Sequence, residues 1–131
     1  FLDEIELITL KENMGLPYAL NCGIKTAKGN YIIRVDADDY VNEDFIFFLE
    51  AMLRENRHMN AVCCDYYLVN DNEEIISRES ASKNPIACGI IFRLSKLIEI
   101  GLYNENFLMH EDKELQERFH KKYRIHNMLN L

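Results

Sequence analysis

The chain has 131 residues and a mass of 15.5 kDa, which is the size of one domain. Its hydrophobic fraction of 48% and charged fraction of 28% are typical of a globular protein and exclude a collagen-like or wholly disordered chain. The net charge is −7 with no basic block, so we expect no nucleic-acid partner. We find no membrane-length apolar run and no signal peptide, and therefore expect a cytoplasmic protein.

The four cysteines, Cys22, Cys63, Cys64 and Cys88, do not have the spacing of a metal site. Cys63 and Cys64 are adjacent, and on a strand they would point to opposite faces. We expect buried, reduced thiols, as in other cytosolic proteins.

Strands and helices alternate in the first half of the chain. Residues 5–10 predict a strand, and a helix over 18–28 follows Pro17, which suits a first helical turn. Residues 31–35 are β-branched and aromatic apart from one arginine, which is typical of a strand buried in a sheet. Asn42 is expected to cap the next helix. The apolar face of that helix holds Phe45, Ile46, Phe48, Leu49, Met52 and Leu53.

The second half of the chain adds a hairpin to this pattern. Residues 61–69 predict a strand, 70–72 a turn and 74–77 a returning arm. The remaining predicted elements are a strand over 89–93, a helix over 94–100 ending at Gly101, a helix over 111–122 and a strand over 123–128. The pattern predicts an α/β fold with a mostly parallel sheet flanked by helices, plus a small hairpin region.

Three aspartates, Asp36, Asp38 and Asp39, follow the strand over 31–35, and such sheets bind ligands at the carboxyl ends of their strands. Like charges this close repel one another, and a divalent cation removes that cost. Carboxylate oxygens suit Mg²⁺ or Mn²⁺, usually one or two of them together with substrate phosphates. The competing interpretation is a solvated acidic loop before the helix that begins near Glu43.

Two known aspartate motifs do not fit this cluster. An EF-hand loop starting at Asp36 would place Val41 where glycine is required and Phe47 where a bidentate glutamate is required. An aspartyl-phosphate phosphatase would carry a threonine shortly after its nucleophilic aspartate, and residues 36–41 contain none.

A second acidic pair, Glu111 and Asp112, opens a helix after an irregular stretch over 103–109. A carboxylate there could act as a general base towards a hydroxyl group. Acidic residues are also common in the first turn of a helix, where the helix dipole favours them. The pair alone therefore leaves both interpretations open.

A larger set of residues follows one order along nearly the whole chain. It comprises Glu12-Asn13-Met14-Gly15, then Ala19, Asn21, Gly23, Ile24, Ala27 and Gly29, then Tyr31-Ile32 and Asp36-Ala37-Asp38-Asp39, then Ile91-Phe92-Arg93, Ile100-Gly101-Leu102-Tyr103 and Glu105, and finally Glu111-Asp112 with Leu115 and Arg118. This ordered set resembles the inverting nucleotide-sugar glycosyltransferases of family 2, which have the GT-A (Rossmann-like) fold.

The resemblance implies the transfer of a sugar, with inversion, from a nucleoside diphosphate sugar to a hydroxyl acceptor. A UDP-sugar is the favoured donor, and the acceptor would be a glycan or a lipid-linked group. Mg²⁺ or Mn²⁺ is the implied cofactor, with Asp39 as its direct ligand. Asp38 would contact the ribose or the water shell of the metal, and Asp36 would position the pair.

The resemblance also implies roles for the other motifs. Of the acidic pair, Asp112 would be the base that deprotonates the acceptor hydroxyl, with Glu111 beside it. The wall next to the nucleotide would be formed by Asn13, Gly15, Ala19 and Asn21.

The family comparison further predicts that this chain is a fragment. The family opens with a strand and turn that hold the nucleotide base, whereas residues 1–10 match a later strand, so about forty residues are expected to be missing. The sheet would then be incomplete, with open edges through which the chain could self-associate. Two readings follow: an enzyme of cell-surface polysaccharide synthesis at the inner face of the membrane, or a non-catalytic binding or assembly module.

Overall fold

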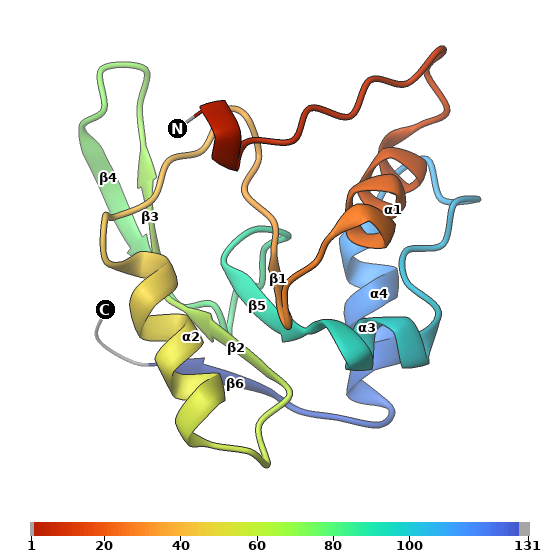
Figure 1. Ribbon diagram of the computed structural model, residues 1–131. Helices are drawn as coiled ribbons and strands as arrows, with labels where there is room; N and C mark the ends of the chain where they lie inside the picture. Colours follow the sequence, from red (N-terminus) through yellow and green to blue (C-terminus); the bar gives the residue numbers. More distant parts are fainter. Residues whose placement is uncertain (1, 129–131) are drawn as a thin grey trace.

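A computed structural model of the protein describes residues 2–128 (Figure 1). Its central sheet has four strands. The strand order is β1 (Tyr31–Ile33), β5 (Ile90–Arg93), β2 (Ala61–Cys64) and β6 (Ile125–Met128). β5 pairs antiparallel with both β1 and β2, whereas β2 and β6 are parallel. The expected mostly parallel sheet is thus right for the direction of β1, β2 and β6. It is wrong for the pairing, because the reversed strand β5 lies between β1 and β2.

Helices cover both faces of this sheet. They are α1 (Leu16–Thr26), α2 (Phe45–Glu55), α3 (Leu94–Ile100) and α4 (Glu111–His120), preceded by a 3₁₀ turn, η1 (Leu2–Glu4). None of these described helices has the length and apolarity that crossing a membrane requires. The predicted helix over 18–28 is confirmed as α1, which begins and ends two residues earlier. The predicted helix over 111–122 is confirmed as α4, which begins at the predicted residue and ends two residues earlier. Gly101 ends α3 in the left-handed conformation, as predicted.

Alternate residues of the sheet form two separate cores. Val62 and Ile91 pack against Leu49 and Leu53 of α2. The neighbouring strand residues point the other way, as the two-residue period of a strand requires. That second core contains Ile24, Ala61, Cys63, Ile90, Phe92, Leu97, Leu115 and Phe119. The α/β class is therefore confirmed.

The predicted strand over 61–69 is divided at Asp65. Its second half, β3 (Tyr66–Val69), pairs antiparallel with β4 (Ile75–Glu79) in a separate two-stranded sheet, so the predicted hairpin is confirmed. The Asp65 carboxylate accepts hydrogen bonds from the Ala81 backbone N–H at 3.0 Å and from Asn127 Nδ2 at 3.1 Å. These distant partners hold the chain at the break.

The predicted strand over 5–10 does not form. Ile5 and Leu7 are 68% and 86% exposed, and no strand of the described residues pairs with this segment. Phe1, matched to the same strand, lies outside the described residues. Within residues 2–128, β1 pairs only with β5, so its other edge is open. The open edge agrees with an incomplete sheet, and self-association through it stays a prediction.

The start of α2 also differs from expectation. The helix begins at Phe45, and Asn42 Oδ1 accepts the backbone N–H of Asp44 at 2.9 Å, so Asn42 stabilises the turn before the helix rather than capping it. The predicted apolar face is only partly buried, because Ile46 and Phe48 remain exposed.

Candidate active site

The first acidic motif is a tight turn beyond the carboxyl end of β1. The backbone N–H of Asp39 donates to the carbonyl oxygen of Asp36 at 3.0 Å, which closes the turn. The carboxylates of Asp36 and Asp39 lie with Cys88 Sγ in a group whose ligand atoms are all within 4.8 Å of one another. Asp38 is exposed on the same turn and lies outside this group.

One arginine joins this turn to the second acidic motif. Arg34 Nε and Nη2 donate to the two carboxylate oxygens of Asp36, at 2.6 and 3.0 Å. Its Nη1 donates to Glu111 Oε1 at 3.1 Å, across 77 residues of sequence. The side chains of Arg34 and Glu111 are each only 11% exposed. A single, largely buried guanidinium therefore brings both predicted acidic motifs into one site.

The ion pairs keep these groups charged. The hydrogen bonds from Arg34 lower the pKa of Asp36 below its ordinary value, although burial opposes this. Burial also opposes the charge on Arg34, but hydrogen bonds to Asp36, Tyr103 and Glu111 outweigh it and raise the pKa of Arg34. Both charges are therefore retained at neutral pH.

The third member of the group, Cys88, offers a soft sulfur atom, whereas Mg²⁺ and Mn²⁺ prefer oxygen ligands. Burial, and then a hydrogen bond to Asp39, raise the pKa of the Cys88 thiol to about 12. Because Arg34 occupies both oxygens of Asp36, Asp39 is the carboxylate of the group best suited to a hard cation such as Mg²⁺ or Mn²⁺.

Glu111 and Asp112 have different surroundings at the start of α4. Glu111 is 8% exposed and is bound to Arg34. Asp112 is half-buried, and its carboxylate takes part in none of the hydrogen bonds or ion pairs found within residues 2–128. His110, just before them, has a left-handed backbone with φ 60°, which is uncommon for a residue other than glycine. Asp112 is thus the member of the pair that is available to an external group.

Asn21, the fourth residue of the predicted nucleotide wall, is buried and has a structural role. Its Oδ1 accepts the backbone N–H of Tyr103 at 2.9 Å, and its Nδ2 donates to the Tyr103 carbonyl oxygen at 2.9 Å and to Glu105 Oε1 at 3.1 Å. The residue is 4% exposed. Its amide therefore fixes the loop after α3 onto α1 and is not free to contact a nucleotide.

Asn21→Ala is expected to loosen this loop locally. The substitution leaves a buried N–H and C=O of Tyr103 without partners, which costs about 1–3 kcal/mol. Native-state hydrogen exchange should show the Tyr103 amide opening at correspondingly lower free energy. Asn106→Ala, at an exposed position of the same loop, should leave that amide unchanged. Unchanged Tyr103 protection in Asn21→Ala would contradict the assigned role.

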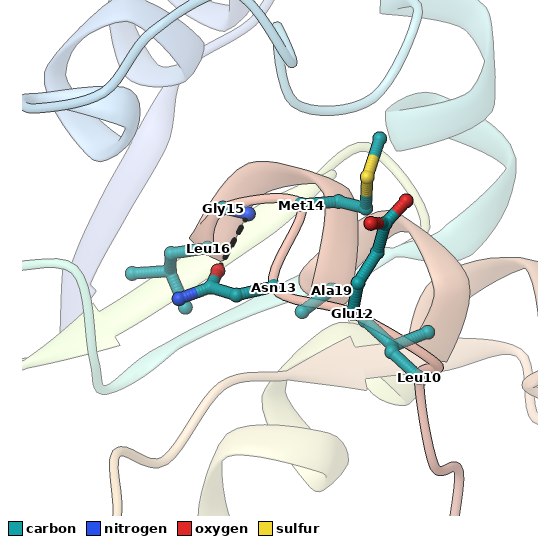
Figure 2. A pocket seen from close by; sticks show the side chains of 7 residues that line it. All are labelled: Leu10, Glu12, Asn13, Met14, Gly15, Leu16 and Ala19. Atoms are coloured by element: carbon teal, nitrogen blue, oxygen red, sulfur yellow. Dashed lines mark hydrogen bonds between the residues drawn. The ribbon is translucent and has the colours of Figure 1, made fainter.

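The other three residues of the predicted nucleotide wall line a pocket at the start of α1, of about 530 Å³ (Figure 2). The pocket is lined by Leu10, Glu12, Asn13, Met14, Gly15, Leu16 and Ala19. Asn13 Oδ1 accepts the backbone N–H of Gly15 at 2.9 Å, the dashed line in Figure 2. Gly15 has φ 92° and ψ 159°, a conformation that essentially only glycine adopts. Asn13, Gly15 and Ala19 therefore share one surface, and Asn21 lies outside it.

Sequence reasoning missed three residues of the site: Arg34, Cys88 and Tyr103. A usable signal existed for Arg34, because a charged residue inside an apolar strand, two positions before Asp36, lies on the same side of the chain as that aspartate. Cys88 and Tyr103 come from distant segments and carry no local signal.

Comparisons with known proteins identify the family of the chain and its fold. The family profile described as Glycosyl transferase family 2 matches residues 1–122. The chain is 35% identical over 72 residues to the glycosyltransferase GlyA of Streptococcus pneumoniae serotype 4, covering 55% of this chain and 10% of GlyA. It is 32% identical over 108 residues to an uncharacterized glycosyltransferase of Haemophilus influenzae, covering 82% of this chain and 28% of that protein. It is 25% identical over 142 residues to the pneumococcal glycosyltransferase GlyG, covering 90% and 47%.

The chain thus spans less than half the length of each of these relatives. Among solved structures, TarS of S. aureus superposes with a TM-score of 0.74 at 19% identity, covering 93% of this chain and 24% of TarS. The structure of TarS residues 1–349 gives a TM-score of 0.69 at 19% identity, covering 91% and 39%. The chain therefore belongs to glycosyl transferase family 2, and its fold is that of the GT-A glycosyltransferases.

Proposed function

We propose that this chain is part of the catalytic domain of an inverting, metal-dependent glycosyltransferase. It would transfer a sugar from a nucleoside diphosphate sugar, a UDP-sugar in the first instance, to a hydroxyl acceptor. The observation that carries the proposal is the meeting of the two acidic motifs at Arg34. Sugar transfer needs charge compensation at the donor phosphates and a proton acceptor near the attacking hydroxyl, and the two motifs offer one of each.

Members of this family generally use a divalent metal ion. In this chain, Asp39 would be its direct protein ligand, and the neighbouring Asp38 would contact its water shell or the ribose. When bound, the ion would offset the negative charge of the diphosphate leaving group. The position of Asp39 within the Asp36–Asp39–Cys88 group supports this assignment.

Asp112 would act as the general base. It would accept the proton of the acceptor hydroxyl as the hydroxyl oxygen bonds to the anomeric carbon. The bond from that carbon to the diphosphate oxygen breaks on the opposite side, which gives a single displacement with inversion. The binding of Glu111 to Arg34 supports Asp112 over Glu111 for this role.

The donor and acceptor surroundings complete the proposal. Asn13, Gly15 and Ala19 would form the wall beside the nucleotide, supported by the pocket they share. Family membership supports a glycan or lipid-linked acceptor in cell-surface polysaccharide synthesis at the inner face of the membrane.

The test uses the full-length protein that contains this chain, incubated with a panel of UDP- and GDP-sugars and Mn²⁺. Release of nucleoside diphosphate and the anomeric configuration of the product, read by NMR, are measured together. We expect turnover of at least one donor, loss of turnover with EDTA, its recovery with Mn²⁺, and an inverted product. Turnover that is unaffected by EDTA, a product with retained configuration, or no turnover of any donor would contradict the proposal.

A further inference from the structure

We infer that Arg34 is a positioning residue that holds the base-bearing end of α4 in register with the aspartate turn after β1. The inference rests on the proposed function, because it concerns how the two halves of that reaction are aligned. Its evidence is a set of contacts that no sequence motif of this chain specifies.

All three guanidinium nitrogens of Arg34 are engaged. Nε and Nη2 bind both oxygens of Asp36, and Nη1 binds Glu111. This planar fork needs arginine, because the ammonium of lysine is a point charge that cannot bind one carboxylate bidentately while reaching a second. Arg34 therefore fixes an orientation between the two segments as well as balancing their charge.

The start of α4 has little else to hold it. Its N-terminal flanking residue, His110, makes no side-chain hydrogen bond that caps the helix, and its backbone is left-handed. The preceding residues Leu108 and Met109 are 91% and 70% exposed. Among the described residues, Arg118 of α4 binds Glu114 and the carbonyl oxygens of Ile100 and Leu102, which holds the helix to the loop after α3. The ion pair between Glu111 and Arg34 is the contact that joins the first turn of α4, and with it Asp112, to the aspartate turn.

Arg34 also lies next to Tyr103, in the loop after α3. Tyr103 is buried, and its side chain contributes to the raised pKa of the arginine. The backbone of Tyr103 is fixed in turn by the amide of Asn21 on α1. The guanidinium therefore lies beside a residue whose backbone is fixed to α1.

A misplaced base affects the chemical step more than donor binding. An error of about 1 Å in the geometry of reacting groups can cost on the order of 10²-fold in rate. Loss of the Arg34 bridge should therefore lower kcat. The KM for the donor should change little, because Arg34 does not line the pocket at α1 and the aspartate turn is closed by its own backbone hydrogen bond from Asp39 to Asp36.

The experiment compares Arg34→Lys, Arg34→Gln, Glu111→Gln and the Arg34→Gln/Glu111→Gln double variant in the full-length protein. We expect Arg34→Lys and Arg34→Gln to lower kcat by roughly 10- to 10²-fold per folded molecule with the donor KM within about twofold. The double variant should be no worse than Arg34→Gln alone, because the two residues act through one contact. In every variant of the series, hydrogen exchange should accelerate at the amide of Glu114, which donates to the His110 carbonyl oxygen at 3.1 Å and so reports the opening of the start of α4.

The matched control is Arg93→Lys. Arg93 also bridges segments, binding the backbone carbonyls of Leu53, Asn56 and Met59, but it pairs with Tyr31 at the opposite end of β1 from Arg34. The Arg93→Lys variant should show faster hydrogen exchange at the amides around these carbonyl groups. Its kcat per folded molecule should equal that of the wild type.

Three results would overturn the inference: wild-type kcat in Arg34→Lys, additive losses in the double variant, or unchanged exchange at α4. If the wild-type protein turned over no donor, the proposed function would fail by itself. The exchange measurement would then still decide whether Arg34 tethers α4.

Discussion

Asp39→Asn in the full-length protein is expected to lower sugar transfer by orders of magnitude while leaving the fold intact. Asp39 is exposed on its turn, and asparagine keeps both the backbone N–H that closes the turn and a side-chain oxygen that can accept from the Cys88 thiol. The substitution removes the negative charge that would bind the metal ion. Calorimetry with UDP should therefore also show that the strengthening of binding by Mn²⁺ is largely lost.

Two further variants make this result specific. Asp71→Asn makes the same change at an exposed turn of the β3–β4 hairpin and should leave both transfer and Mn²⁺-dependent binding unchanged. Asp38→Asn should reduce transfer less than Asp39→Asn, because Asp38 lies outside the Asp36–Asp39–Cys88 group. Near-wild-type transfer by Asp39→Asn would remove the metal role of that residue.

Asp112→Asn should abolish most of the transfer without weakening donor binding. Removing a positioned general base typically costs about 10²–10⁴ in rate. The carboxylate makes no contact that the described fold uses, so α4 should keep its hydrogen-exchange protection. Rates at saturating donor, together with calorimetry of the nucleoside diphosphate, measure the two effects separately.

The neighbouring acids of α4 provide the comparison. Glu117→Gln, exposed on the same helix, should be neutral. Glu111→Gln should show a smaller loss that is accompanied by faster exchange at the start of α4, because it breaks the contact with Arg34. If Glu111→Gln proved more damaging than Asp112→Asn while α4 stayed protected, the base would be Glu111.

The elements that sequence patterns predicted correctly are those that depend on local chemistry. The strand at the start of the apolar run over 31–35, the hairpin around Asn70-Asp71-Asn72 and the left-handed stop at Gly101 each follow from residues within a few positions of one another. The strand ends at Ile33, two residues before the predicted end, and Val35 is exposed. The aspartate turn also follows from adjacent residues. The third member of its group, Cys88, comes from a distant loop and does not follow from them.

The errors concern contacts that a local pattern does not contain. Residues 5–10 are rich in the apolar and β-branched residues of a strand, but a strand needs a neighbour for its backbone hydrogen bonds, and the described part of the chain offers none. The break at Asp65 depends on Ala81 and Asn127. The hydrogen bonds of the Asn21 amide to Tyr103, 82 residues away, are likewise outside any local pattern.

The central claim is that the aspartate turn and the start of α4 form one metal-dependent site. The most direct test is a crystal structure of the full-length protein with Mn²⁺ and UDP, with the ion located by its anomalous signal. The account predicts Mn²⁺ bound by the Asp39 carboxylate and the diphosphate, with Arg34 bridging Asp36 and Glu111 and with Asp112 facing the bound ligand. Mn²⁺ bound away from Asp39, or Asp112 directed away from the ligand, would contradict it.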